Sequence, residues 1–379
     1  MTGTTLQRLL DEGVEKEVFP SAQAVVLRAG RILFEGLAGE ADPETPFDLA
    51  SVTKVIATTT LVMDLWSRGT LTPEMPLNRF EAESPVALAG ATVADLLYHR
   101  AGLPGFIPLF ERPLRASPEL VTYGGSPERR RRVAREVMEQ AWRTPLLYPR
   151  GSKALYSDLG FILLGELICR VSGVPLDSLF EERIAAPLGL RCSFHRLSCL
   201  PADARTAAPT GFSRPREPAP GQEGLWAPFE PVPSGRGEVD DDNAFALDGV
   251  AGHAGLFGTA TAVARYGQAV LEELKGAGRW APPELWAHAL RCDGKTPGSS
   301  RAMGFDTPTL PSSAGEIFGN RPPGAVGHLG FTGTSLWIDL GRELVVALCT
   351  NRTARGRADG RIREFRPRFH DQVMQTLSL

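Results

Sequence analysis

Strand-like segments occur near both ends of the 379-residue chain, and helix-like segments lie between them. Residues 21–28 and 31–36 predict a hairpin, because short β-prone runs flank a tight turn. Residues 325–339 and 343–350 predict two further strands joined by a turn. Strands so far apart in sequence can share a core if both chain ends pair in one mostly antiparallel sheet. The pattern therefore predicts an α+β fold in which an antiparallel sheet is flanked by helices.

The middle of the chain has a different character, with helical patterns separated by loops rich in Pro and Gly. We expect a discontinuous sheet domain made of residues 1–75 and 245–379. Residues 76–244 are expected to form a mostly helical second domain, with a cleft between the two. Within it, residues 200–242 hold many Pro, Gly and charged residues, which predicts a long surface loop.

Composition limits the classes of partner that we expect. The net charge is −3, and no apolar stretch reaches the ~18 residues that a membrane helix needs. The arginine run at 129–135 has acidic neighbours, and residues 352–368 are also interpreted as a basic surface, so neither nucleic acid nor a membrane is an expected partner. The first residues lack the pattern of a secretory signal, and the cysteine count is odd, so we expect a cytoplasmic protein with reduced thiols.

The segment Ala50-Ser51-Val52-Thr53-Lys54 places a Ser three positions before a Lys at the start of a predicted helix. Residues three apart share a helix face, so the hydroxyl and the amine are expected to lie side by side. A Lys whose pKa is lowered by burial can take the hydroxyl proton and turn Ser51 into a nucleophile. The same residues also fit a helix cap followed by an exposed Lys. Partners elsewhere in the chain must decide between these interpretations.

Two other segments carry side chains that suit such a site. Tyr156-Ser157-Asp158 precedes an apolar helical segment, and a Tyr beside a protonated Lys can exchange protons. His328-Leu329-Gly330-Phe331 is predicted to open the next-to-last strand, where Gly330 lets a backbone or a ligand approach closely. The N–H groups of Phe331 and Ser51 would then be placed to stabilise an oxyanion.

Together, S-x-x-K, Y-S-D and H-x-G occur in this order and resemble the motifs of the serine β-lactamase and penicillin-binding protein superfamily. The version with Tyr is similar to class C β-lactamases, to DD-peptidases and to carboxylesterases built on that fold. Segments 97–104 and 249–257 resemble further family segments. The resemblance implies the β-lactamase/transpeptidase-like fold, with Ser51 as the acylated nucleophile, Lys54 as its base partner and Tyr156 sharing the proton transfer.

The resemblance also implies roles for four other residues, two of which depart from the family pattern. His328 and Gly330 match the first and third residues of the K-T-G strand, and Phe331 matches the oxyanion donor. Asp158 stands where many members carry Asn, and an ionised Asp would pair with Lys54. His328 stands where β-lactam-directed members carry Lys or Arg, and a neutral His is a weak counter-ion for a carboxylate. Both departures favour esters without an obligatory carboxylate.

The leading hypothesis is a serine hydrolase that forms an acyl-enzyme with small acyl esters. DD-peptidase or β-lactamase activity is one alternative, and a non-catalytic ligand-binding protein that retains the fold is another. A small-molecule acyl substrate is the expected partner, and the sequence does not indicate the oligomeric state. Cys192, His195 and Cys199 lie close in sequence but lack a standard zinc spacing, so no metal or cofactor is expected.

Overall fold

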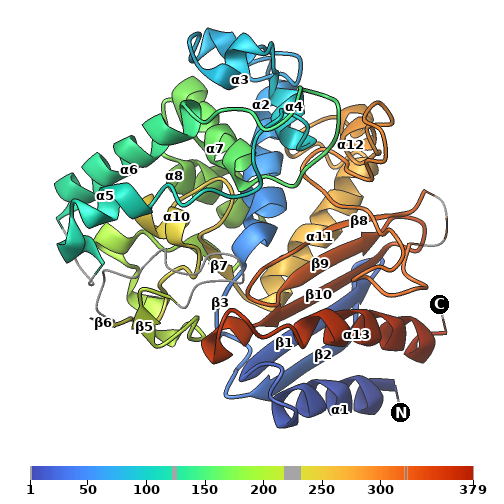
Figure 1. The fold of residues 1–379 in the computed structure, drawn as a ribbon. Coiled ribbons are helices and arrows are strands. Elements are labelled where there is room, and N and C mark those ends of the chain that lie inside the picture. Colours follow the sequence, from blue (N-terminus) through green and yellow to red (C-terminus); the bar gives the residue numbers. More distant parts are fainter. Residues whose placement is uncertain (1, 122–125, 217–231, 320, 322, 379) are drawn as a thin grey trace.

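The computed structural model describes residues 2–121, 126–216, 232–319, 321 and 323–378 (Figure 1). Its main sheet has five antiparallel strands in the order β2-β1-β10-β9-β8. The central pair joins the two ends of the chain, with Val26 opposite Val346. The α+β class expected from the sequence is confirmed. The five strands are β1 (Ser21–Arg28), β2 (Arg31–Gly39), β8 (Ala325–Leu329), β9 (Ser335–Asp339) and β10 (Leu344–Thr350).

Helices cover both faces of this sheet (Figure 1). The alternation of strand side chains explains why, since Ala24 and Val26 of β1 face one buried cluster while Val25 and Leu27 face another. The terminal helices α1 (Thr2–Glu15) and α13 (Ile362–Thr376) close the first cluster. Helix α11 (Ala260–Leu274) packs on the opposite face. The sheet is therefore buried on both sides.

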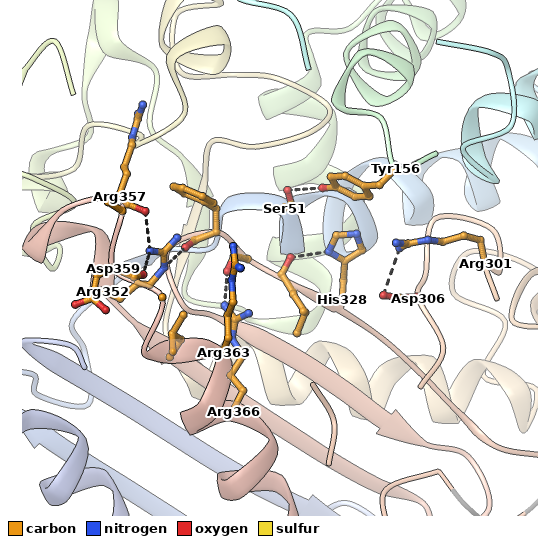
Figure 2. Close-up of a pocket in the computed structure, with 16 residues that line it drawn as sticks. Ser51, Tyr156, Arg301, Asp306, His328, Arg352, Arg357, Asp359, Arg363 and Arg366 are labelled. Atoms are coloured by element: carbon orange, nitrogen blue, oxygen red, sulfur yellow. Dashed lines mark hydrogen bonds and ion pairs between the residues drawn. The ribbon is translucent and has the colours of Figure 1, made fainter. Parts of the chain in front are cut away.

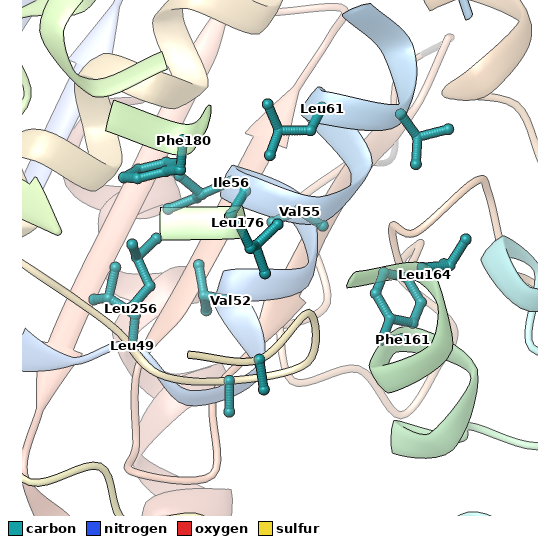
Figure 3. Close-up of a cluster of buried hydrophobic side chains, with 14 of the residues drawn as sticks. Leu49, Val52, Val55, Ile56, Leu61, Phe161, Leu164, Leu176, Phe180 and Leu256 are labelled. Carbon is teal, nitrogen blue, oxygen red and sulfur yellow. The ribbon is translucent and has the colours of Figure 1, made fainter. Parts of the chain in front are cut away.

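The middle of the chain is mainly helical, and it packs around the segment that follows Ser51. Val52 and Ile56 belong to one buried cluster with Phe161 and Phe180 of neighbouring helices (Figure 3). The remaining helices are α2 (Thr60–Ser67), α3 (Pro85–Leu88), α4 (Val93–Leu97), α5 (Glu111–Arg115), α6 (Pro127–Trp142), α7 (Asp158–Ser172), α8 (Leu176–Phe180), α9 (Ala186–Leu188), α10 (Asp242–Ala246) and α12 (Pro283–Ala289).

Two small sheets complete the described structure. One has the order β3-β7-β4, and the other pairs β5 with β6. Their bounds are β3 (Phe47–Asp48), β4 (Cys192–Phe194), β5 (Ser213–Arg214), β6 (Val232–Pro233) and β7 (Leu256–Gly258). In the described ranges no single helix is long and apolar enough to cross a membrane, although α7 and residues 176–188 meet that test as a pair bent by 78°. The division into domains 1–75 with 245–379 and 76–244 stays a prediction.

Two sequence-based expectations need correction. Residues 325–339 form two strands instead of one, because the chain turns between Gly330 and Gly333, whose φ of +100° suits only glycine well. His328 therefore lies near the end of β8 and does not open the next-to-last strand. The predicted surface loop 200–242 is partly buried. Arg214 is buried and donates to Asp242 at 2.8 Å, since paired charges can enter a protein interior. Residues 217–231 of that loop lie outside the described residues.

Candidate active site

The chain turns sharply just before Ser51. Ala50 has a φ of +46°, which costs a residue with a Cβ about 1–2 kcal/mol, and it begins a 3₁₀ turn at Ala50–Val52. Hydrogen bonds hold this turn from two sides. The Asp48 carboxylate accepts from the N–H of Ala50 at 2.8 Å, and the Thr334 hydroxyl donates to the carbonyl of Leu49 at 3.1 Å. A π-helical segment, Lys54–Thr59, then leads into α2.

The side chains of Ser51, Lys54 and Tyr156 meet at one point, although Tyr156 is 105 residues from Ser51 along the chain. Lys54 Nζ lies 2.9 Å from Ser51 Oγ. The Tyr156 hydroxyl donates to the same oxygen at 2.6 Å (Figure 2). The interpretation of Ser51 as a helix cap with an exposed Lys is wrong, because Lys54 is 0% exposed. A serine oxygen between an amine and a phenol has two groups at hand that can move its proton.

The Lys54 ammonium group has three N–H donors, and the structure provides an acceptor for each of them. Besides Ser51 Oγ, these are Asp158 Oδ1 at 2.7 Å and the carbonyl oxygen of His253 at 3.1 Å. Burial lowers the pKa of Lys54, and the Asp158 carboxylate partly opposes that effect. Burial raises the pKa of Tyr156 well above its usual value, and Asp158 adds to this. The phenol therefore keeps its proton in the resting site, and Lys54 is the group brought closer to neutrality.

The Tyr156 loop is held by the segment that resembled a second family motif, residues 97–104. His99 Nδ1 accepts from the N–H of Ser157 at 3.0 Å, and the Ser157 hydroxyl donates to the carbonyl of Pro104 at 2.6 Å. The His99 ring also packs against Tyr156, with 4.8 Å between ring centroids. Ser157 caps α7, so the first helical residue, Asp158, points at Lys54. Local helix capping thus orients both Tyr156 and Asp158.

The other predicted residues line the space next to Ser51. His328 is buried, and burial together with Lys54 holds the pKa of its ring well below 6.5, so it is neutral at physiological pH. A Cβ on Gly330 would lie 1.8 Å from the Thr334 hydroxyl and 2.7 Å from the carbonyl of Leu49. Gly330 thus allows the Ser51 turn itself to approach. Phe331 is 43% exposed, and its N–H has no acceptor among the described residues.

Ser51 opens onto a cavity of about 480 Å³ that the sequence analysis did not foresee (Figure 2). Tyr156, His328, Gly330 and Phe331 line it, which we expected of a substrate site. Five arginines and two aspartates also line it, and we call it the arginine cavity. The arginines are Arg301, Arg352, Arg357, Arg363 and Arg366.

The interpretation of residues 352–368 as a basic surface is wrong for part of the segment. Arg352, Arg357 and Arg366 are buried, and with Arg363 they face the cavity. The unusual density of arginines was the available signal, but a solvated helix face has the same composition.

A second cavity, of about 200 Å³, lies on another side of Ser51, and we call it the aspartate cavity. Asp158 lines it together with three consecutive aspartates, residues 240–242. Ser51, Tyr156, Phe331 and Arg357 line both cavities. In the ranges that the structure describes, no three His, Cys, Asp or Glu side chains are arranged to hold a metal ion.

Several known proteins resemble this chain over most of its length. The profile of a protein family described as "Beta-lactamase" matches residues 6–366. A Bacillus subtilis protein named "N-acetylmuramyl-L-alanine amidase" is 29% identical, over 91% of this chain and 80% of that protein. A "putative D-alanyl-D-alanine carboxypeptidase" of Escherichia coli K12 is 26% identical, over 92% of this chain and 83% of its own. The solved structure of "EstCE1, a hydrolase with promiscuous acyltransferase activity" has a TM-score of 0.70, with 22% identity and 98% of each chain covered.

Proposed function

The chain belongs to the beta-lactamase family of hydrolases, and on this premise we propose that it is a serine hydrolase that forms an acyl-enzyme at Ser51. The observation that carries the proposal is the position of Ser51 Oγ, which lies 2.9 Å from Lys54 Nζ and 2.6 Å from the Tyr156 hydroxyl. A serine hydroxyl is a weak nucleophile until a nearby group removes its proton. A buried amine with a lowered pKa meets that requirement.

In the proposed first step, neutral Lys54 takes the proton of Ser51 while Oγ attacks the substrate carbonyl. The N–H groups of Ser51 and Phe331 stabilise the oxyanion; two such preorganised donors are the usual device of acyl transfer. The leaving group takes a proton from the Tyr156 hydroxyl, which Lys54 restores. Water then attacks the acyl-enzyme by the reverse route and frees Ser51.

Small acyl esters are the substrates that this machinery handles most readily, because an ester leaving group needs little protonation. Amides or peptides that carry a carboxylate are the second candidate, and two observations favour them. The names of the two relatives describe an amidase and a carboxypeptidase. The arginines beside Ser51 also supply the positive charge that His328 lacks, which weakens the sequence-based argument against carboxylate substrates.

The test combines acylation with turnover. We expect the wild type to hydrolyse p-nitrophenyl acetate and to gain the mass of a fluorophosphonate at Ser51. In Ser51→Ala, the rate of hydrolysis should fall by at least about a thousandfold and the added mass should be absent. Ser152→Ala is the matched control, because Ser152 is exposed and outside both cavities. Undiminished turnover by Ser51→Ala would remove Ser51 from the nucleophile role. Ligand binding without acylation would favour the non-catalytic alternative. Nitrocefin and peptides ending in D-alanyl-D-alanine then separate β-lactamase and DD-peptidase activity from esterase activity.

A further inference from the structure

In the proposed mechanism Tyr156 gives its proton to the leaving group, yet its surroundings favour the protonated phenol. Burial raises the pKa of Tyr156 well above its usual value, and the negative charge of Asp158 adds to this effect. A weaker acid transfers its proton to a leaving group more slowly. A positive charge near the phenol opposes both effects, because it stabilises the phenolate. The site therefore gains from a cation held close to Tyr156.

Two cationic groups of the described residues lie over the Tyr156 ring. Lys54 Nζ is 4.9 Å from the ring centroid, and the guanidinium carbon of Arg301 is 5.4 Å from it. A cation within about 6 Å of an aromatic face is attracted by the ring electrons. The charge of Lys54 changes during the proposed reaction, because its amine accepts and returns a proton. A guanidinium keeps its proton, so Arg301 supplies a constant charge.

Two histidine rings also pack against Tyr156, and both are neutral. The ring centroids of His99 and His328 lie 4.8 and 5.7 Å from that of Tyr156. Burial holds the pKa of each histidine well below 6.5. The positive charge of Arg301 lowers the pKa of Tyr156, and it also lowers those of both histidines. Arg301 thus acts electrostatically on every ring around the phenol.

The main chain holds Arg301 in place, and its side chain lines the arginine cavity. Its carbonyl accepts from the N–H of Asp293 at 3.1 Å, and residues 302–305 are buried. The guanidinium lies 3.4 Å from the Asp306 carboxylate, longer than the roughly 2.7–2.9 Å of a charge-assisted hydrogen bond. Figure 2 shows this pair beside Tyr156 and apart from the other arginines of the cavity. A loose ion pair leaves part of the positive charge of Arg301 uncompensated at the phenol.

We propose that Arg301 is a positioning residue whose charge stabilises the Tyr156 phenolate formed when the leaving group takes its proton. In this step the C–O or C–N bond of the tetrahedral intermediate breaks, and the leaving atom keeps the electron pair and takes the phenol proton. The phenolate then takes a proton from Lys54. The inference rests on the proposed function and deepens it, because it names a substrate class. That class is acyl compounds whose leaving group needs a proton, such as alkyl esters and amides.

Asp306 provides a test of opposite sign, because its negative charge partly cancels the charge of Arg301. Burial raises the pKa of Asp306, and Arg301 opposes this change. The N–H of Thr307 donates to Asp306 Oδ1 at 3.0 Å, and the carbonyl oxygen of an Asn can accept the same bond. Asp306→Asn therefore removes the charge while it keeps the shape and this contact.

The experiment compares two neutral esters, p-nitrophenyl acetate and benzyl acetate. Both form the same acetyl-enzyme, but benzyl alcohol needs a proton to leave whereas p-nitrophenolate does not. The readout is kcat/KM for benzyl acetate divided by kcat/KM for p-nitrophenyl acetate, which excludes deacylation. We expect the wild type to hydrolyse both esters.

Arg301→Gln is the informative variant. It should lower the ratio about three- to tenfold, because removing a charge at this distance weakens the acidity of the phenol. Hydrolysis of p-nitrophenyl acetate should change less than about twofold, which also shows that the variant folds. Arg301→Lys keeps the charge and should retain most of the ratio, and Asp306→Asn should raise it. Arg291→Gln is the matched control, since Arg291 is exposed and lines neither cavity, and its ratio should equal that of the wild type.

The outcomes separate the two proposals. An equal ratio in the wild type and Arg301→Gln overturns the role of Arg301 and leaves the serine hydrolase standing. A lower ratio in Asp306→Asn also overturns it, because loss of the negative charge should strengthen the effect of Arg301. A wild type that hydrolyses p-nitrophenyl acetate but not benzyl acetate overturns the substrate class. Absence of turnover for both esters, with no acylation of Ser51, overturns the proposed function and the role of Arg301 with it.

Discussion

The two cavities that meet at Ser51 balance their charges in opposite ways. In the aspartate cavity, each carboxylate has a cationic or imidazole partner within the protein. In the arginine cavity, Arg352, Arg363 and Arg366 form no close ion pair with a carboxylate among the described residues, although the charges of Asp240 and Asp359 act on Arg352. The partners in the aspartate cavity are Lys54 for Asp158, Arg357 for Asp240, His253 for Asp241, and Arg214 with Arg357 for Asp242. A balanced cavity is complete by itself, whereas an unbalanced one gains from a charged ligand.

On each side of Ser51, the pKa of one buried group reflects its surroundings. Burial raises the pKa of Asp48 to about 7, and the negative charges of Asp240 and Asp241 contribute, although two backbone N–H groups oppose the change. Burial lowers the pKa of Arg366 to about 9, and neighbouring arginines contribute. Each group is thus pushed toward neutrality mainly by burial, and like charges nearby add to the effect.

The largest expected effect concerns Tyr156, which lines both cavities. Tyr156→Phe removes the hydroxyl that donates to Ser51 Oγ and protonates the leaving group, so kcat should fall by about 10²–10⁴-fold. Because Tyr156 protonates the leaving group of every substrate in the proposed mechanism, kcat should fall to a similar extent for charged and neutral esters. The measurement is kcat for para-acetoxybenzoate and para-acetoxybenzamide. A loss confined to one member of the pair would mean that Tyr156 recognises charge instead of moving a proton.

The contact of Ser51 with Lys54 followed from local geometry, whereas the approach of Tyr156 followed from the resemblance to a family. A spacing of three residues fixes Ser51 beside Lys54. The helix that begins at Asp158 fixes the loop before it, and the resemblance to a family placed the two segments together. The hairpin of β1 and β2 was also predictable, because two β-prone runs flank a tight turn.

The arginine cavity did not follow, because its parts come from separate segments with no local signature. Arg352, Arg363 and Arg366 have the composition of a solvated basic surface. Only the packing of α13 in the fold buries Arg366 against the carbonyls of Gly330 and Gly333. The division of 325–339 into two strands was missed for a similar reason. Apolar and β-prone residues continue through the turn, and only the close approach of Gly330 to the Ser51 turn explains the break.

The second prediction tests the balance on the aspartate side through Asp48→Asn. The Asp48 carboxylate accepts from the N–H groups of Ala50 and Asp240, at 2.8 and 2.7 Å. An amide has one acceptor oxygen, so one N–H would lose its partner at a cost of about 1–3 kcal/mol in the free energy of unfolding. Chemical denaturation of the variant and the wild type at several pH values measures this cost. The strained turn at Ala50 should also loosen and lower kcat.

The loss of unfolding free energy in Asp48→Asn should become smaller as the pH rises. Because the folded-state pKa of Asp48 is raised from 3.8 to about 7, its contribution to stability is fully present below about pH 4 and declines as the pH rises through 7. Asn does not titrate, so the deficit of Asp48→Asn should be largest at acidic pH and should shrink toward pH 8. Asp11→Asn, an exposed substitution in α1, serves as the control. A deficit that grows with pH would mean that Asp48 is an ordinary, low-pKa carboxylate in the folded protein.

The smallest expected effect is a shift in the pH profile of Asp158→Asn. The Asp158 carboxylate lies 2.7 Å from Lys54 Nζ and holds the proton on the amine against the effect of burial. Removing that charge lowers the pKa of Lys54 further, so neutral Lys54 is available at lower pH. The acidic limb of kcat/KM for a neutral ester should move down by about one pH unit. A limb that stays in place would show that Lys54 is not the titrating base, and one that moves to higher pH would show that Asp158 itself accepts the proton. Either result would mean that the aspartate cavity does not act by setting the pKa of Lys54.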